Sequence, residues 1–376
     1  ALPTTPGVRF GRYRTVAFDG CVSFKVPDTD RNRSWLGKLR AALGTTGYPV
    51  IELMTLVETG TRAMLGAVFG PPATAETDYA RKLLGLLGAD MLVLADRGFD
   101  AEAFLGELAG TGAQFLVRLR VTRRLPVLAQ LDDGSYLSRI GELTVRIIVA
   151  DITVTCADGT RYTANYRLAT TLTDPRRHPA RQLVALYHER WEHEIAYLAL
   201  HHTLAAGRVL RSTDPAGLEQ EMWALLTVYQ AIRRAMVTAI ESRPGTDPDR
   251  AGFTTALETA KDLLVTAINV TGDTTDLIGR IGRAVLEPFL QAVGNLLRRP
   301  DHAVMPTATG DLAPASQPRP ARIAAAPSAA GVIHMMGRRS TLKPSGSGTA
   351  YGFGRWCGLR LGLVQLRLPA GPTLYL

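Results

Sequence analysis

The chain has 376 residues, of which 46% are hydrophobic, and this is enough for one large domain or two to three smaller ones with a sizeable core. A formal net charge of +9 at pH 7 favours a polyanionic partner, although many soluble proteins reach this excess without one. The three cysteines are far apart, which excludes a disulfide framework and a cysteine metal site and suits a reducing cytosol. No signal peptide and no apolar run of about 18 residues is visible, so we expect no membrane span.

The first predicted strand covers residues 13–24 and contains Asp19 among strand-forming residues such as Val16 and Phe18. An aspartate in mid-strand is unfavourable unless it is paired or binds a cation. Two alternatives follow for Asp19: an edge-strand residue that faces water, or a site residue.

A basic segment follows this strand. It surrounds Trp35 with four cations, which are Arg31, Arg33, Lys38 and Arg40. Clustered cations with an aromatic residue can grip a DNA backbone. A solvated run of charges is the more common interpretation, and it remains open beside the first.

Asp96 follows a short buried strand. A β-hairpin over residues 50–69 and a helix precede the wholly apolar run Met91–Ala95, which is typical of a parallel strand. Asp96 comes next, ahead of a helix over about residues 100–109. Ligands of open α/β sheets bind at the carboxyl ends of strands, so Asp96 is either a site residue or a helix cap. One more strand is predicted over residues 114–120.

The alternation of strands and helices stops beyond residue 120. Residues 121–178 are rich in Val, Ile, Thr and Tyr with turn residues between them, which predicts an antiparallel β insertion. Residues 212–298 contain further helical segments, which we expect to be packing helices that help to build a dimer. Residues 299–376 are rich in Pro, Ala, Gly and Ser, which predicts an irregular or disordered basic tail.

One helix, predicted over residues 179–204, organises the chain. Tyr187, Arg190, Glu194 and His201 recur at helical steps and share one stripe beside an apolar stripe. Such a helix packs on a core and presents a cluster of charges. By itself the pattern also fits a solvated polar face with ion pairs inside the helix, which is the more common case.

The spacing of Tyr187, Arg190 and Glu194 resembles the signature of insertion-sequence DDE transposases, and more narrowly that of the insertion element four family, which cuts DNA through hairpin intermediates. His201 stands where that family has Lys. The sequence ADRGF around Asp96 is similar to the family's motif at the second catalytic aspartate. The resemblance does not extend to the helical N-terminal domain with which the family recognises inverted repeats. Because the chain also begins at Ala1 without Met, we expect it to be a truncated form.

The resemblance implies an α/β fold with a ribonuclease-H-like core, an antiparallel β insertion and C-terminal packing helices. The resulting division has five parts. They are residues 1–120 as the first part of the core, 121–178 as the insertion, 179–211 as the core helix with the third carboxylate, 212–298 as the helical region and 299–376 as the tail.

The resemblance also implies that Asp19, Asp96 and Glu194 are the catalytic residues and the ligands of two Mg²⁺ ions, for which Mn²⁺ can substitute. Grouped carboxylates repel one another strongly unless a cation is present, and Mg²⁺ prefers such oxygen ligands. Two ions about 3.5–4 Å apart suit an in-line phosphoryl displacement.

Four residues are candidate contacts to DNA, three of them by the resemblance. By the resemblance Tyr187, Arg190 and His201 contact phosphate near the cleavage point. Histidine is fully charged only below about pH 6.5, so His201 should bind phosphate more weakly than Lys at neutral pH. Trp191 either stacks on a displaced base or packs in the core, and core packing is the more common role.

The implied function is a DNA transposase, which hydrolyses phosphodiester bonds at transposon ends, forms a hairpin and joins the 3′ ends to target DNA. The implied partners are double-stranded DNA and a second copy of the chain, in the bacterial cytoplasm at the nucleoid. A truncated remnant that binds DNA without cutting it is the alternative. A ribonuclease-H-like nuclease unrelated to transposition is a third hypothesis, although simple hydrolysis does not need the Tyr-Arg-Glu helix.

Overall fold

A computed structural model describes residues 9–38, 40–41, 44–45, 47–156, 161–188, 190, 196–243, 251–267, 279–287, 361–367 and 374–375. All of them belong to the same compact unit of the chain. Among these residues, no helix is long and apolar enough to cross a membrane.

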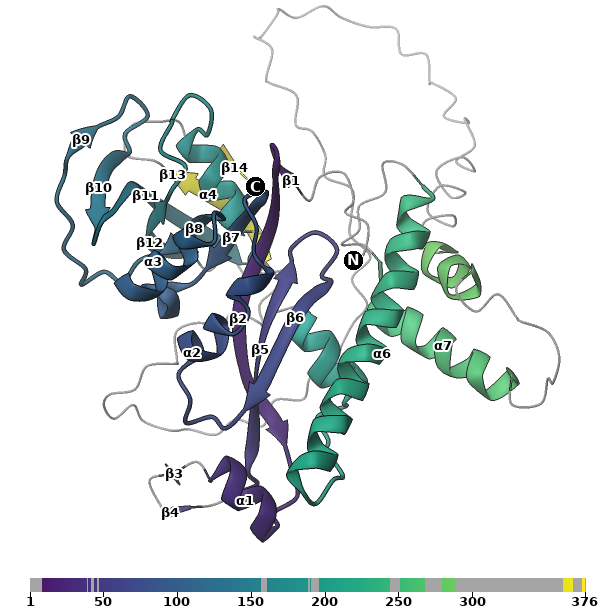
Figure 1. Cartoon of the computed structure of the whole chain (residues 1–376). Helices are drawn as coiled ribbons and strands as arrows, with labels where there is room; N and C mark the ends of the chain where they lie inside the picture. Colours follow the sequence, from purple (N-terminus) through teal and green to yellow (C-terminus); the bar gives the residue numbers. More distant parts are fainter. Residues whose placement is uncertain are drawn as a thin grey trace, which may run out of the picture. The chain divides into compact units, whose positions relative to one another are not determined.

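Five strands form the centre of one large sheet. They are β2 (Tyr13–Lys25), β5 (Val50–Glu58), β6 (Met64–Gly70), β7 (Met91–Ala95) and β8 (Gln114–Arg118). They lie in the order β8-β7-β2-β5-β6, as Figure 1 shows in part. β2, β7 and β8 are parallel, whereas β5 is antiparallel to both β2 and β6. This order and orientation are those of a ribonuclease-H-like core, so the predicted fold class is confirmed.

Short helices connect the parallel strands and cover one face of the sheet. They are α2 (Glu76–Arg81) and the 3-10 turn η1 (Leu84–Leu86) before β7, and the 3-10 turn η2 (Arg97–Phe99) and α3 (Glu102–Gly110) after it. Their apolar residues join alternate residues of the strands in one buried cluster. In this cluster the rings of Phe18, Phe99 and Phe104 lie 5.6 to 6.2 Å apart.

A second apolar cluster involves the helix that organises the sequence. The structure describes this helix as α4 (Ala180–His188), the helical pair Ala196–Tyr197 and the π-helical segment η3 (Leu198–Leu204). Leu200 belongs to the same buried cluster as Leu53 of β5.

The longest described helix, α6 (Pro215–Glu241), lies in the predicted helical region and begins with a side-chain cap. Asp214 caps it by accepting a hydrogen bond from the Gly217 amide at 3.0 Å, and proline is its first residue. Figure 1 shows α6 beside the β5–β6 hairpin, where the Met64 amide donates to Gln230 Oε1 at 3.1 Å. α7 (Phe253–Ala267) and the helical residues 279–287 share a third apolar cluster with α6, so they act as the expected packing helices.

The predicted antiparallel insertion is confirmed, and it continues the core sheet. Its strands are β9 (Ala129–Gln130), β10 (Tyr136–Ile140), β11 (Leu143–Cys156) and β12 (Arg161–Thr170). β12 pairs with β8, with Leu168 opposite Arg118. Arg146 of β11 is fully buried, pairs with Asp133 and donates to the carbonyl oxygen of His178 at 2.6 Å. It thereby joins the insertion to the segment that leads into α4.

Two strands near the C-terminus contradict part of a prediction. β13 (Leu361–Arg367) pairs with β11, and β14 (Leu374–Tyr375) pairs with β13. The prediction of an irregular tail is therefore wrong for these strands, and its remaining residues lie outside the described chain. Their partner, β11, is distant in the sequence, so the local composition could not show that an open sheet edge was available to them.

Three short strands complete the description. β1 (Arg9–Phe10) pairs with β2, and β3 (Arg40–Ala41) pairs with β4 (Gly44–Thr45) in a separate small sheet. The helix α1 (Asp30–Leu36) precedes that small sheet.

Candidate active site

Two of the predicted catalytic carboxylates lie on neighbouring parallel strands. β2 and β7 are paired in register, and the last pair is Ala17 opposite Leu94. Carrying this register two residues further places Asp19 opposite Asp96, which still has an extended backbone. Adjacent strands are about 4.8 Å apart, and side chains at matching positions of parallel strands point to the same face. The fold therefore brings together two aspartates that are far apart in the sequence.

Each of these aspartates is held by a glycine amide that follows it. Gly20 N donates to Asp19 Oδ1 at 3.0 Å, and Gly98 N donates to Asp96 Oδ1 at 2.7 Å. The second bond makes Asp96 the N-cap of the 3-10 turn η2 and not of the predicted helix, because α3 starts after Ala101, which provides no side-chain cap. Each glycine amide binds only the Oδ1 atom of its aspartate. These hydrogen bonds are therefore compatible with a further role of the Oδ2 atoms.

Arg190 lies against the first carboxylate. Its Nη1 atom is 3.6 Å from Asp19 Oδ2, and its side chain is 10% exposed. The predicted DNA-contacting arginine and the predicted first catalytic residue therefore meet in the structure.

Tyr187 is buried next to the second carboxylate. Its hydroxyl group donates to the carbonyl oxygen of Ala95, the residue before Asp96, at 3.1 Å. Burial raises the pKa of Tyr187 above its ordinary value, which disfavours loss of the proton that the hydroxyl group donates. In this arrangement Tyr187 holds the strand end that carries Asp96.

Tyr197 lies just before η3 and connects this helical segment to the strands β2 and β5. It was not predicted as a site residue. Its hydroxyl group lies 2.7 Å from the carbonyl oxygen of Asp19 and 3.1 Å from that of Leu53, and it accepts from Thr55 Oγ1 at 3.1 Å. Burial raises the pKa of Tyr197 well above its ordinary value. Tyr197 follows Glu194 at a helical step of three, and this spacing was the available sequence signal.

His201 of η3 packs against a part of β2 that is distant from Asp19. Its ring packs edge-on against Phe24 with centroids 5.4 Å apart, and it also meets His202 at 4.7 Å. Phe24 is several residues beyond Asp19 along β2, so the structure does not bring His201 to the pair of aspartates.

A glutamate that the sequence did not single out lies beside Asp96. Glu76 is exposed as a whole residue, but its carboxylate end lies between Gly20 and Gly98. Burial of this end, and then the charge of Asp96, raise the pKa of Glu76. Glu76 has no periodic partner in the sequence, and the available signal was a glycine close behind each of the two predicted catalytic aspartates.

Glu52 of β5 is a second such glutamate, and it is 2% exposed. Burial, and then the charge of Glu76, raise the pKa of Glu52 to about 7. The negative charges of Asp96, Glu76 and Glu52 therefore influence one another in sequence: Asp96 acts on Glu76, and Glu76 acts on Glu52.

Glu194 and Trp191 lie outside the described residues, and their roles stay predictions. Within the described part of the chain, no three His, Cys, Asp or Glu side chains are placed to hold a metal ion. Asp19 and Asp96 fit a divalent cation through the chemistry of their donors, since both offer hard oxygen atoms at the same level of the sheet. Glu194 would supply the third carboxylate.

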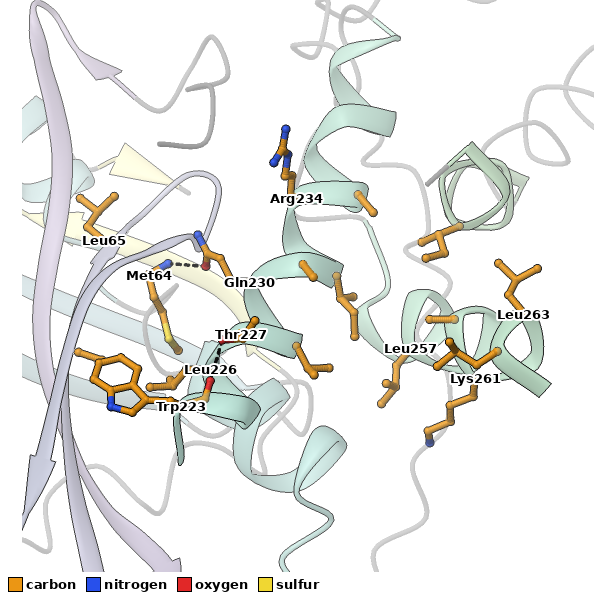
Figure 2. A pocket seen from close by; sticks show the side chains of 18 of the residues that line it. Met64, Leu65, Trp223, Leu226, Thr227, Gln230, Arg234, Leu257, Lys261 and Leu263 are labelled. Carbon is orange, nitrogen blue, oxygen red and sulfur yellow. Dashed lines mark hydrogen bonds between the residues drawn. The ribbon is translucent and has the colours of Figure 1, made fainter. Parts of the chain in front are cut away.

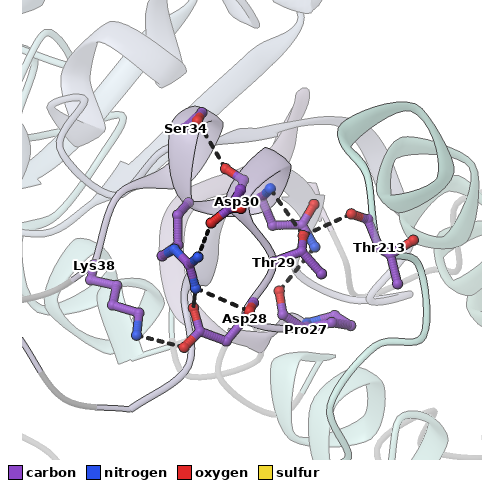
Figure 3. A network of polar contacts seen from close by, with 9 residues as sticks. Pro27, Asp28, Thr29, Asp30, Ser34, Lys38 and Thr213 are labelled. Atoms are coloured by element: carbon purple, nitrogen blue, oxygen red, sulfur yellow. Dashed lines mark hydrogen bonds and ion pairs between the residues drawn. The ribbon is translucent and has the colours of Figure 1, made fainter.

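The basic segment around Trp35 forms local ion pairs. Arg33 Nη1 and Lys38 Nζ lie 2.8 and 2.6 Å from the carboxylate of Asp28, and Arg33 also contacts Asp30 (Figure 3). For Arg33 and Lys38, these ion pairs favour the interpretation of a solvated run of charges over that of contacts to a DNA backbone.

An apolar groove of about 880 Å³ lies where β6, α6, α7 and residues 279–287 meet (Figure 2). Trp223 of α6 meets Phe69 of β6 beside it, with ring centroids 5.4 Å apart. The described lining of this groove contains no carboxylate, so it includes neither of the two aspartates predicted to be catalytic.

Comparison with protein families identifies the chain. Residues 11–231 match the family model described as transposase DDE domain. The chain belongs to the transposase DDE-domain family. The matched range includes Asp19, Asp96 and Glu194, and this family generally uses divalent metal ions.

Known transposases resemble this DDE-family chain. It is 26% identical over 279 residues to the transposase InsG of insertion sequence element IS4 from Escherichia coli (strain K12), and this confirms the predicted family resemblance. The match covers 70% of this chain and 61% of InsG, so the chain spans about three fifths of that relative's length. A cryo-EM structure of a piggyBac transposase synaptic complex with hairpin DNA is similar at 11% identity and a TM-score of 0.40. That match covers 75% of this chain and 58% of the other.

Proposed function

We propose that the chain is the catalytic part of a DNA transposase, which cleaves phosphodiester bonds at transposon ends and joins the 3′ ends to target DNA. Family membership supports the reaction class. The observation that carries the site is the β2–β7 register, which sets Asp19 opposite Asp96. Glu194 is the third carboxylate of the proposal and lies within the matched range.

Asp19, Asp96 and Glu194 would hold two Mg²⁺ ions, which when bound activate the attacking oxygen and stabilise the leaving oxygen of an in-line displacement. The amides of Gly20 and Gly98 orient the first two carboxylates before the substrate arrives. This orientation lowers the cost of assembling the site around the phosphate.

Two tyrosines and an arginine support these carboxylates. Tyr187 and Tyr197 hold the backbone at Asp96 and Asp19 through buried hydroxyl groups. Arg190 would meet a phosphate that binds beside Asp19; its contact with the Asp19 carboxylate supports this role, because a guanidinium group pairs with phosphate as readily as with carboxylate.

The proposed partners are double-stranded DNA, which includes the terminal inverted repeats and the target, and a second copy of the chain. The net charge of +9 supports a polyanionic partner. Trp191 and His201 stay proposed DNA contacts, although His201 would need to leave Phe24 to reach the cleavage point. We place the protein at the nucleoid in the bacterial cytoplasm.

The test is a cleavage assay on DNA that carries the sequences bordering the gene of this chain, with products resolved on denaturing gels. Nicks and hairpins should need Mg²⁺ or Mn²⁺ and should disappear in Asp96→Asn and Glu194→Gln. Asp78→Asn is the matched control, because it removes a negative charge on α2 that already pairs with Arg81 at 2.5 Å. Cleavage that survives both site substitutions refutes the proposed site. Salt-sensitive DNA binding without any cleavage would instead support the remnant hypothesis.

A further inference from the structure

The carboxylate of Glu76 occupies a slot between the two glycines that follow the catalytic aspartates. A Cβ atom added to Gly20 would lie 3.1 Å from Glu76 Oε1, and one added to Gly98 would lie 3.2 Å from Glu76 Oε2. Both distances are shorter than most contacts that Cβ atoms make. A Cβ atom at either glycine would therefore force the carboxylate of Glu76 to shift by a few tenths of an ångström, and at Gly20 also Met54 Cε, which would lie 3.2 Å away.

Space, rather than backbone conformation, is what these glycines provide. Neither Gly20 nor Gly98 has a positive φ, so other residues could adopt the same backbone. The added Cβ atom of Gly98 would also lie 2.9 Å from Asp96 Oδ1. A side chain at Gly98 would thus meet the carboxylates of both Asp96 and Glu76, while the amide of Gly98 donates to Asp96.

Among the described residues, no cation forms an ion pair with Glu76. Arg81 of the same helix pairs instead with Asp78 and with Glu107, at 2.5 and 2.8 Å. Two neighbouring carboxylates that lack a basic partner repel each other unless a cation lies close by. A divalent cation at Asp96 would remove this repulsion.

We propose that Glu76 is a fourth carboxylate of the DDE site and accepts hydrogen bonds from the water shell of the divalent cation at Asp96. This inference rests on the proposed function. Mg²⁺ usually keeps several of its waters, and these need acceptors of fixed position. Glu76 is thus a positioning residue for the cation.

The test measures the affinity of the whole chain for Mn²⁺ alone, by calorimetry or by electron paramagnetic resonance, together with thermal unfolding without metal. Glu76→Gln keeps the size of the side chain and should weaken Mn²⁺ binding about tenfold, as the loss of an outer-shell acceptor does. It should not lower the unfolding temperature, because it removes repulsion toward Asp96. The matched control Asp78→Asn takes the same charge from the same helix and should leave the affinity unchanged.

A second variant changes the position of Glu76 but keeps its charge. Gly20→Ala should push the carboxylate aside and also weaken Mn²⁺ binding, and it should add little to Glu76→Gln because both act through one group. If Asp96→Asn abolishes binding while Glu76→Gln leaves it unchanged, the role of Glu76 is overturned and the proposed site stands. If Asp96→Asn also leaves binding unchanged, the proposed function itself fails. A Glu76→Gln chain that unfolds earlier without metal would show a purely structural role and would likewise overturn the inference.

Discussion

Glu52 makes the stability of the fold depend on pH near neutrality. Its side chain is 2% exposed, and burial followed by the charge of Glu76 raises its pKa from 4.5 to about 7. The unfolded chain releases this proton near pH 4.5, whereas the folded chain keeps it until about pH 7. The contribution of Glu52 to the free energy of unfolding is therefore complete below pH 4.5. It decreases as the pH rises between these values and is lost above pH 7.

The size of the effect follows from the two pKa values. One pKa unit corresponds to about 1.4 kcal/mol, so the interval from 4.5 to about 7 corresponds to at most about 3 kcal/mol. Glu52→Gln keeps the shape of the side chain and cannot ionise. Relative to the unsubstituted chain, we expect this variant to gain up to about 3 kcal/mol of stability between pH 4 and pH 8.

Urea unfolding at a series of pH values, followed by circular dichroism, measures this difference. Glu142→Gln is the control, because Glu142 is exposed between β10 and β11 and its replacement should have the same small effect at every pH. The reasoning is refuted if the stability difference between Glu52→Gln and the unsubstituted chain is the same at pH 4 and pH 8.

Three further predictions concern single side chains. Arg146→Met leaves Asp133 without its buried partner and should cost about 3–5 kcal/mol in urea unfolding, so a loss below about 1 kcal/mol would contradict the role of this ion pair. Tyr197→Phe removes a hydroxyl group that bonds backbone carbonyls of β2 and β5 and should cost about 1–2 kcal/mol. The rate of DNA cleavage by Tyr197→Phe should also fall in the folded protein, and an unchanged rate would exclude a positioning role. Asp214→Ala removes the cap at Gly217 and should lower stability by about 1 kcal/mol, whereas Asp214→Asn, which can still cap, should retain most of it.

Local patterns alone determined the elements of the core. The apolar run Met91–Ala95 predicted β7 with its observed bounds, because a strand buried on both faces needs apolar residues throughout. The start of α6 at Asp214 and Pro215 is also a local feature, because capping and the fixed φ of proline act within one turn. The same kind of information placed Asp19 within a strand and Asp96 after one.

Only the tertiary structure decided which of these residues meet. The register of β2 against β7 sets Asp19 opposite Asp96, and hydrogen bonds between distant strands determine it. The place of Glu76 follows from the packing of α2 on the sheet and from the space at two glycines, neither of which leaves a periodic signal. The partner of β13 was hidden for a related reason, because an open sheet edge exists only after β11 has formed. Spacing along the chain reports local backbone preference and burial, whereas contacts between distant segments depend on where the whole fold places them.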